Sequence, residues 1–199
     1  MKPRSLRPAW LPALLAPLFG CASHPDLPTV PSVDLPRFMG SWYVLTHVPA
    51  SSEKDAFNAI ERYTLGEEGR IETTYAFRQG AFDADFKVMD PVGFVEDTTT
   101  NATWSMRFVW PIKAEYLIVH LEPDYSATIV ARTKRDYAWI MARDPQVPEE
   151  RLAALEARLV AMGYEAADLR RVPQRWPDPE HPLDPERPGE GSDRPAPGD

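Results

Sequence analysis

Few side chains in this 199-residue sequence have the types and spacing that catalysis or metal binding requires. Its four histidines, His24, His47, His120 and His181, show no metal-ligand spacing. We find no Gly-x-Ser-x-Gly elbow, no His-Glu-x-x-His motif and no glycine-rich phosphate loop. A single cysteine, Cys21, excludes an internal disulfide and a cysteine-based metal cluster. The sequence therefore predicts no enzyme, metal site or cofactor, and the chemistry that remains is that of one thiol.

The residues before Cys21 are typical of a secretory signal. A basic start precedes residues 8–20, an apolar run of 13 residues. This run is too short to span a bilayer as a helix but fits the core of a signal peptide. It ends Leu18-Phe19-Gly20-Cys21, which resembles the bacterial lipobox, although a residue smaller than Phe19 is commoner there. We expect residues 1–20 to be a signal peptide and Cys21 to carry a lipid. A plain signal peptide with a free cysteine is the alternative.

Two proline-rich arms flank the middle of the chain. The residue after Cys21 is alanine, and an aspartate there would indicate retention in the inner membrane, so we expect an outer-membrane lipoprotein facing the periplasm. Residues 21–36, with four prolines, predict an extended tether between lipid and domain. Residues 175–199 are rich in proline and acids, and no aromatic follows Trp176. Such a segment buries too little apolar surface to fold, so a disordered acidic tail is expected.

The overall charge argues against nucleic acid as a partner. The chain has 30 acidic and 22 basic residues, a formal net charge of −8, and its basic residues are scattered. Nucleic-acid binders are usually basic, with lysine and arginine gathered on one face. The composition, 43% hydrophobic and 26% charged, is that of an ordinary globular domain.

Residues 37–174 show the period-two alternation of strands, with turn signals every eight to twelve residues or so. In residues 70–78, for example, Ile71, Thr73, Tyr75 and Phe77 share one face. Pro91 interrupts the fourth strand, which indicates a bend or an edge. The expected strands cover residues 40–47, 58–65, 70–78, 82–88, 102–109, 116–121, 126–132 and 137–143.

The period changes to that of a helix after Pro148. Leu152, Leu155, Leu159 and Met162 form one stripe with a 3.6-residue period. Gly163 is a suitable end for this helix, and residues 169–172 could add a short ninth strand. Eight strands with one apolar face each favour an all-β fold, a closed eight-stranded antiparallel up-and-down β-barrel with one C-terminal helix packed outside. A sandwich stays open on the pattern alone.

Three stretches together resemble the lipocalin family over about residues 36–174. The first is Gly40-Ser41-Trp42-Tyr43, preceded by Phe38, which matches the family's glycine-x-tryptophan signature. Asp124-Tyr125 matches the family's threonine-aspartate-tyrosine turn, with proline in place of threonine, and Arg143 ends the last strand. The branch that looks most similar is that of the bacterial outer-membrane lipocalins, which join the same barrel to a lipobox.

The resemblance implies structural roles for these signature residues. Trp42 can plug one end of the barrel, and Arg143 can stack on its ring and bind carbonyls of the entry segment. Gly40 belongs to the same signature, and Asp124 and Tyr125 are expected to form a turn rather than to touch a ligand.

The resemblance also implies a cavity inside the barrel. If Trp42 points inward, parity places Val44 and Thr46 inside as well. Such an aromatic and flexible wall suits an acyl chain or another greasy molecule, and the alternative is that these side chains simply fill the barrel. The ligand-binding candidates are Tyr75, Phe77, Phe86, Trp104, Met106, Phe108, Tyr116, Ile118, Tyr137 and Trp139.

Two polar residues are expected to face the same interior. Glu61 would point inward, where a lone carboxylate is costly unless an arginine or tyrosine partners it, and a strand register shifted by one residue is the alternative. His120 shares parity with Tyr116 and Ile118, and is expected to be a hydrogen-bonded wall residue. The polar segment 51–57 lies where the family has its mouth loop, and its composition predicts a mobile, solvated lid.

Two functions fit this sequence. The first is an outer-membrane-anchored lipocalin that stores or transports an apolar small molecule, such as a fatty acid (palmitate, for example) or a lysophospholipid, in envelope maintenance. The second is a structural or interaction lipoprotein with a filled barrel. Either would meet the membrane through its lipid anchor, and a homodimer remains open.

Overall fold

The computed structural model describes residues 24–50 and 53–184, so Cys21, the expected signal peptide and residues 185–199 lie outside the described range. The strands are β1 (Gly40–Val48), β2 (Ala56–Leu65), β3 (Arg70–Gln79), β4 (Phe86–Met89), β5 (Val92–Val95), β6 (Thr103–Val109), β7 (Ile112–Leu121), β8 (Ala127–Ala131), β9 (Ala138–Ala142) and β10 (Arg170–Arg171). The helices are α1 (Leu35–Phe38) and α2 (Glu149–Ala161), with short 3₁₀ turns at Glu67–Gly69 and Ala166–Asp168.

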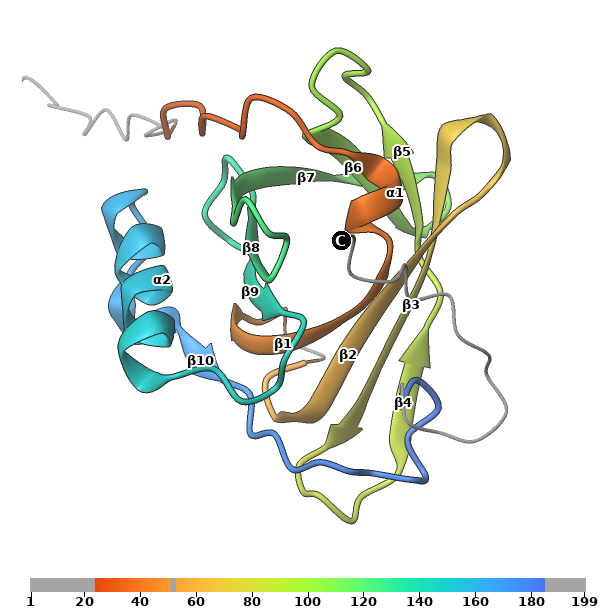
Figure 1. The fold of residues 1–199 in the computed structure, drawn as a ribbon, viewed down its shortest axis with the longest axis vertical. Helices are drawn as coiled ribbons and strands as arrows, with labels where there is room; N and C mark the ends of the chain where they lie inside the picture. The colour runs from red at the N-terminus through yellow and green to blue at the C-terminus, as the bar shows by residue number, and fades with distance from the viewer. Residues whose placement is uncertain (1–23, 51–52, 185–199) are drawn as a thin grey trace, which may run out of the picture.

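The sheet closes into a barrel (Figure 1). Antiparallel neighbours run in the order β1-β2-β3-β5-β6-β7-β8-β9, and β9 pairs back with β1, Tyr43 lying opposite Ala142. β4 and β5 both pair with β3 and flank Asp90-Pro91, so they form one strand that the proline interrupts. β10 adds a short pairing to β1. The predicted eight-stranded antiparallel barrel with one main outer helix is therefore confirmed.

Alternation along each strand separates two apolar cores. In β9, Trp139 and Met141 belong to the core inside the barrel, whereas Ala138 and Ile140 belong to a second core outside it. The outer core is covered by α2, whose Leu155 and Leu159 are buried. Figure 1 shows α2 beside β8, β9 and β10. No helix within residues 24–50 and 53–184 is long and apolar enough to cross a membrane.

The floor of the barrel is built around Trp42 and Arg143. The Arg143 guanidinium lies 3.7 Å from the centre of the Trp42 ring. It donates hydrogen bonds to the carbonyls of Ser41 (2.7 Å), Met39 (2.7 Å), Phe38 (2.9 Å) and Arg37 (3.0 Å). These carbonyls come from α1, from Met39 just after it and from the start of β1. Gly40 has a φ of +90°, a conformation that favours glycine, where the chain turns from α1 into β1.

The Asp124-Tyr125 turn fastens α1 to the same end of the barrel. Asp124 accepts a hydrogen bond from the Ser126 backbone N–H at 3.0 Å, and Tyr125 has a φ of +61°. The Tyr125 hydroxyl accepts from the backbone N–H of Asp34 at 2.9 Å, and Arg37 lies over its ring at 4.0 Å. Both residues have the local, structural surroundings of a turn.

Two β-bulges overturn the parity expected for two residues. A bulge in β1 between Val44 and Thr46 leaves Val44 inside but turns Thr46 outward, where its hydroxyl donates to Glu156 of α2 at 2.8 Å. A second bulge lies in β7 between Ile118 and His120. His120 is thereby paired with Ile129 of the outer core, and it bonds Glu122 at 3.2 Å instead of facing the interior with Ile118. One extra residue in a strand reverses the side on which every later residue lies.

The N-terminal arm differs from the expected free tether. Leu27 and Val33 are buried against the barrel. Backbone N–H groups of Val30 and Val33 donate to the carbonyls of Ile118 (2.9 Å) and Thr100 (2.7 Å). The arm therefore packs on the barrel wall, because Leu27, Val30 and Val33, three residues apart between the prolines, supply apolar surface that can be buried.

The expectation of a disordered tail from residue 175 is wrong for residues 175–184. Asp178 is buried in an ion pair with Arg78 of β3 (2.8 Å) and accepts a hydrogen bond from the Asn58 amide (2.9 Å). His181 and Leu183 are buried as well. The acids and prolines of this segment suggested a solvated chain, but one buried ion pair and a few apolar anchors hold it on the barrel.

Candidate ligand-binding cavity

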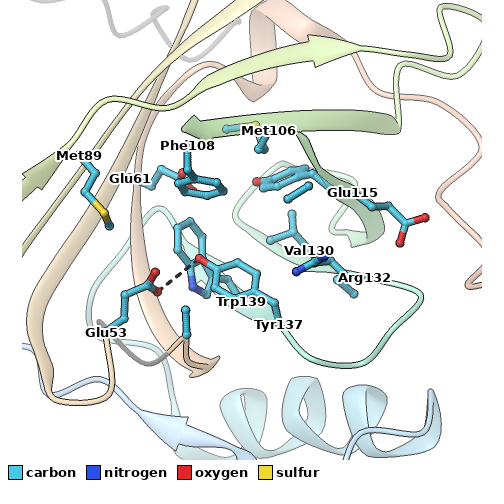
Figure 2. Close-up of a pocket in the computed structure, with 14 residues that line it drawn as sticks. Glu53, Glu61, Met89, Met106, Phe108, Glu115, Val130, Arg132, Tyr137 and Trp139 are labelled. Atoms are coloured by element: carbon cyan, nitrogen blue, oxygen red, sulfur yellow. Dashed lines mark hydrogen bonds between the residues drawn. The ribbon is translucent and has the colours of Figure 1, made fainter. Parts of the chain in front are cut away.

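A cavity of about 280 Å³ lies inside the barrel, towards the end opposite α1. This volume is close to the lower end of the roughly 300–1,000 Å³ range of small-molecule sites. The lining comes from the loop after β1, from β2, β4, β6 and β7, and from both sides of the β8–β9 turn (Figure 2). The lining residues are Ala50, Glu53, Glu61, Met89, Met106, Phe108, Ala114, Glu115, Tyr116, Val130, Ala131, Arg132, Tyr137 and Trp139.

Glu61 places a carboxyl group in this lining. It lies opposite Trp42 on one side and Tyr75 on the other, so it faces inward, and only 1% of its surface is exposed. The Tyr63 hydroxyl donates a hydrogen bond to Glu61 and also bonds the hydroxyl of Tyr116. Burial raises the pKa of Glu61 well above its ordinary value. The expected inward orientation and tyrosine partner of Glu61 are confirmed.

Glu53 is a second buried carboxyl group, which the sequence reading did not single out. It belongs to the segment expected to be a solvated lid, yet only 3% of its surface is exposed. Its Oε2 accepts a hydrogen bond from the Tyr137 hydroxyl at 3.3 Å. Burial raises the pKa of Glu53 to about 7. Ser51 and Ser52 lie outside the described residues, and the polar composition of this loop gave no signal that its glutamate turns inward.

A family model described as a lipocalin-like domain matches residues 33–174, most of the chain. The chain belongs to the lipocalin family. Among curated proteins, it is 25% identical to temperature-induced lipocalin-1 of Arabidopsis thaliana, over 81% of this chain and 90% of the relative. It is 25% identical to the outer membrane lipoprotein Blc of Citrobacter freundii, over 73% of this chain and 81% of the relative. Bovine (Bos taurus) apolipoprotein D is 27% identical, over 80% of this chain and 90% of the relative.

Solved structures share the lipocalin fold at lower identity. Insecticyanin from the tobacco hornworm Manduca sexta aligns with a TM-score of 0.59 at 13% identity, over 75% of this chain and 85% of that one. The cockroach allergen Per a 4 aligns with a TM-score of 0.57 at 21% identity, over 77% of this chain and 96% of that one.

Nine of the ten ligand candidates lie inside this lipocalin barrel or line its cavity. Met106, Phe108, Tyr116, Tyr137 and Trp139 line the cavity. Tyr75, Phe77, Trp104 and Ile118 are buried in the inner core without lining it. The ring of Trp104, for example, stacks on Tyr116 at 5.3 Å and so supports the wall from behind.

The placement of Phe86 inside the barrel is wrong. Phe86 lies opposite Arg78, which faces outward, and its ring contacts the Arg78 guanidinium at 3.9 Å. It also packs against His181 of the C-terminal segment, with 4.9 Å between the ring centroids. The turn after β3 sets this register, which the alternation alone could not fix, and it brings Met89 rather than Phe86 to the cavity.

Replacing Glu53 by glutamine is expected to change how stability depends on pH. The folded protein keeps a proton on Glu53 that the unfolded chain releases, because the pKa rises from 4.5 to about 7. The carboxyl's stabilising contribution is therefore full below pH 4.5 and is lost as the pH rises through 7. Relative to wild type, Glu53→Gln should gain about 2 kcal/mol between pH 5 and pH 8, measured by urea unfolding.

The exposed Glu72 of β3 provides the matched control. Glu72→Gln removes the same carboxyl at an exposed position and should change stability by less than about 0.5 kcal/mol. A Glu53→Gln difference that does not change with pH would show that this carboxyl titrates normally.

Proposed function

We propose that this lipocalin holds one apolar small molecule in its cavity and stores or transports it at the bacterial outer membrane. The observation that carries the proposal is the cavity itself, which has mainly aromatic, methionine and small apolar walls and is closed at one end by the Trp42 floor. Methionine and aromatic walls adapt to flexible apolar ligands. A fatty acid or lysophospholipid fits, with its acyl chain inside and its head group towards Arg132 at the mouth.

Anchoring through Cys21 is the second part of the proposal. Two relatives of this chain, from Citrobacter freundii and Escherichia coli, carry the name outer membrane lipoprotein Blc. The Arg135 guanidinium, in the β8–β9 turn at the mouth, donates to the carbonyl of Pro25 at 2.8 Å. Four residues span at most about 14 Å. A lipid on Cys21 would therefore keep the open end of the barrel close to the bilayer.

Exposed apolar residues at the same end support a mouth that faces lipid. Val109, Trp110 and Ile112 form the tip of the β6–β7 hairpin and are 68%, 79% and 71% exposed. The hairpin adjoins the cavity through Phe108 and Ala114. Tryptophan is enriched where proteins meet the membrane–water interface.

Ligand binding is tested by titrating the protein without residues 1–21 with a dansyl-labelled undecanoic acid. We expect saturable binding of one probe per chain, with a blue-shifted dansyl emission that unlabelled palmitate reverses. An emission that rises without saturation, or not at all, would contradict the carrier function.

Replacing Cys21 by serine tests the anchor. In a Gram-negative host fed an alkyne-tagged fatty acid, the wild-type chain should carry the tag and sediment with outer membranes. Cys21→Ser should lose the tag, because no thiol remains to accept the lipid. Equal labelling of the two chains would refute lipidation at this residue.

A further inference from the structure

The cavity contains two carboxyl groups and no cation bound to them. Among the described residues, no lysine or arginine forms an ion pair with Glu53 or Glu61. The only arginine in the lining, Arg132, pairs with Asp136 at 3.2 Å. Tyr137 donates its hydroxyl to Glu53 and Tyr63 donates its hydroxyl to Glu61, and the Trp139 side chain also lies close enough to Glu53 to lower its pKa. Burying an unpaired carboxylate is costly, which is why the pKa of each group is raised, and a cation inside the cavity would stabilise the ionised form of both.

A buried hydroxyl beside these carboxyls also lacks a partner. The Tyr75 side chain is fully buried, and its hydroxyl has no hydrogen bond. Burial is the main cause that raises the pKa of Tyr75, and the nearby charges of Glu53 and Glu61 raise it further. Its ring packs on that of Trp139, which lines the cavity, with 4.8 Å between centroids. This hydroxyl therefore lies beside the two carboxyls without a hydrogen-bond partner among the described residues.

Aromatic rings form much of the cavity wall around the two carboxyls. Tyr116, Tyr137 and Trp139 line the cavity together with the two glutamates, and Figure 2 shows the carboxyl of Glu53 turned towards the rings of Tyr137 and Trp139. A ring face attracts a cation, most strongly away from water. The other titratable groups in the lining are Arg132 and Glu115. Glu115 is exposed and accepts hydrogen bonds from Thr133. Glu53 and Glu61 are therefore the carboxyl groups in the buried part of the cavity.

We propose that the cavity selects amphiphiles that carry a protonated amine on an apolar body over those that carry an acid. An ammonium group has three donors, which suit the carboxyls of Glu53 and Glu61 in the lining, and its charge offsets theirs where screening by water is weak. A carboxylate near the same groups is repelled, and a neutral alcohol offers one donor. The inference rests on the proposed function, because it concerns the same cavity, and it ranks an amine above a fatty acid among the amphiphiles that this cavity can take.

The test compares decylamine, decanol and decanoate, which share one chain length, by isothermal titration calorimetry at pH 8. Decylamine is expected to bind roughly tenfold or more tightly than decanol, and decanoate more weakly than decanol. In Glu61→Gln and Glu53→Gln, the ratio of amine affinity to alcohol affinity should fall roughly tenfold. Glu72→Gln, on the outer face, should keep the wild-type preference.

The outcomes separate the two proposals. Equal binding of amine and alcohol, or a preference unchanged in both cavity variants, overturns the amine selectivity but leaves the carrier function standing. Failure of all three ligands to bind a folded wild-type protein contradicts both. Thermal unfolding of each variant establishes that it is folded, and a glutamine at either site keeps the shape of the glutamate.

Discussion

Replacing Arg143 by alanine is expected to lower the free energy of unfolding by about 3 kcal/mol or more. One guanidinium satisfies four backbone carbonyls and covers the Trp42 ring at 3.7 Å. Without it, the carbonyls of Arg37, Met39 and Ser41 lose the guanidinium donor at the floor of the barrel, whereas that of Phe38 keeps the Trp42 indole N–H. Burial lowers the pKa of Arg143 to about 10, so the side chain stays charged at neutral pH and its hydrogen bonds remain charge-assisted.

Urea unfolding followed by tryptophan fluorescence measures this loss. Arg143→Lys should recover only part of it, because a single ammonium cannot reach four carbonyls in different directions. Arg107→Ala is the control, since Arg107 also lies over an aromatic ring, Phe94 at 4.9 Å, but holds no floor carbonyl. If the Arg143 and Arg107 variants lost similar stability, the floor would not depend on the guanidinium.

Filling the mouth of the cavity is expected to abolish ligand binding without unfolding the barrel. Ala114 lines the cavity near the start of β7 and is only partly buried. An indole at this position would occupy much of a space of about 280 Å³, while its outer edge stays near solvent. We expect Ala114→Trp to weaken binding of the dansyl-labelled fatty acid at least roughly tenfold and to change stability by less than about 1 kcal/mol.

The matched control adds the same side chain elsewhere. Val88 lies on β4, is 48% exposed and does not line the cavity. Val88→Trp should bind the probe as the wild-type protein does. Unchanged binding by Ala114→Trp would place the ligand somewhere other than this cavity.

The barrel and its floor could be predicted because their signals are local. Each strand carries its own alternation, and a barrel follows from the number of strands with one apolar face. The lipocalin signature identifies Trp42 in the first strand and Arg143 after the last strand by residue type, so the resemblance correctly predicted that the two side chains stack. Glu61 was also predictable, because it lies on β2 without a bulge between it and Tyr63.

The residues that were misplaced depend on register or on distant partners. Thr46 follows a bulge, and Phe86 follows a turn whose length sets the pairing with β3. A period-two pattern shows neither feature, because it is the same before and after a one-residue shift. Glu53 and the segment around Asp178 have polar sequences that resemble solvated loops. Their burial is decided by Tyr137 and Arg78, which are far away in the chain.

Native mass spectrometry tests the carrier function most directly. The protein would be made in a bacterial host without residues 1–21, purified without detergent and compared before and after denaturing extraction. We predict a single co-purified amphiphile per chain, released on denaturation and absent from folded Ala114→Trp. An empty wild-type barrel that also fails to take up the dansyl-labelled fatty acid would contradict the carrier function and would favour a structural lipoprotein with a filled barrel.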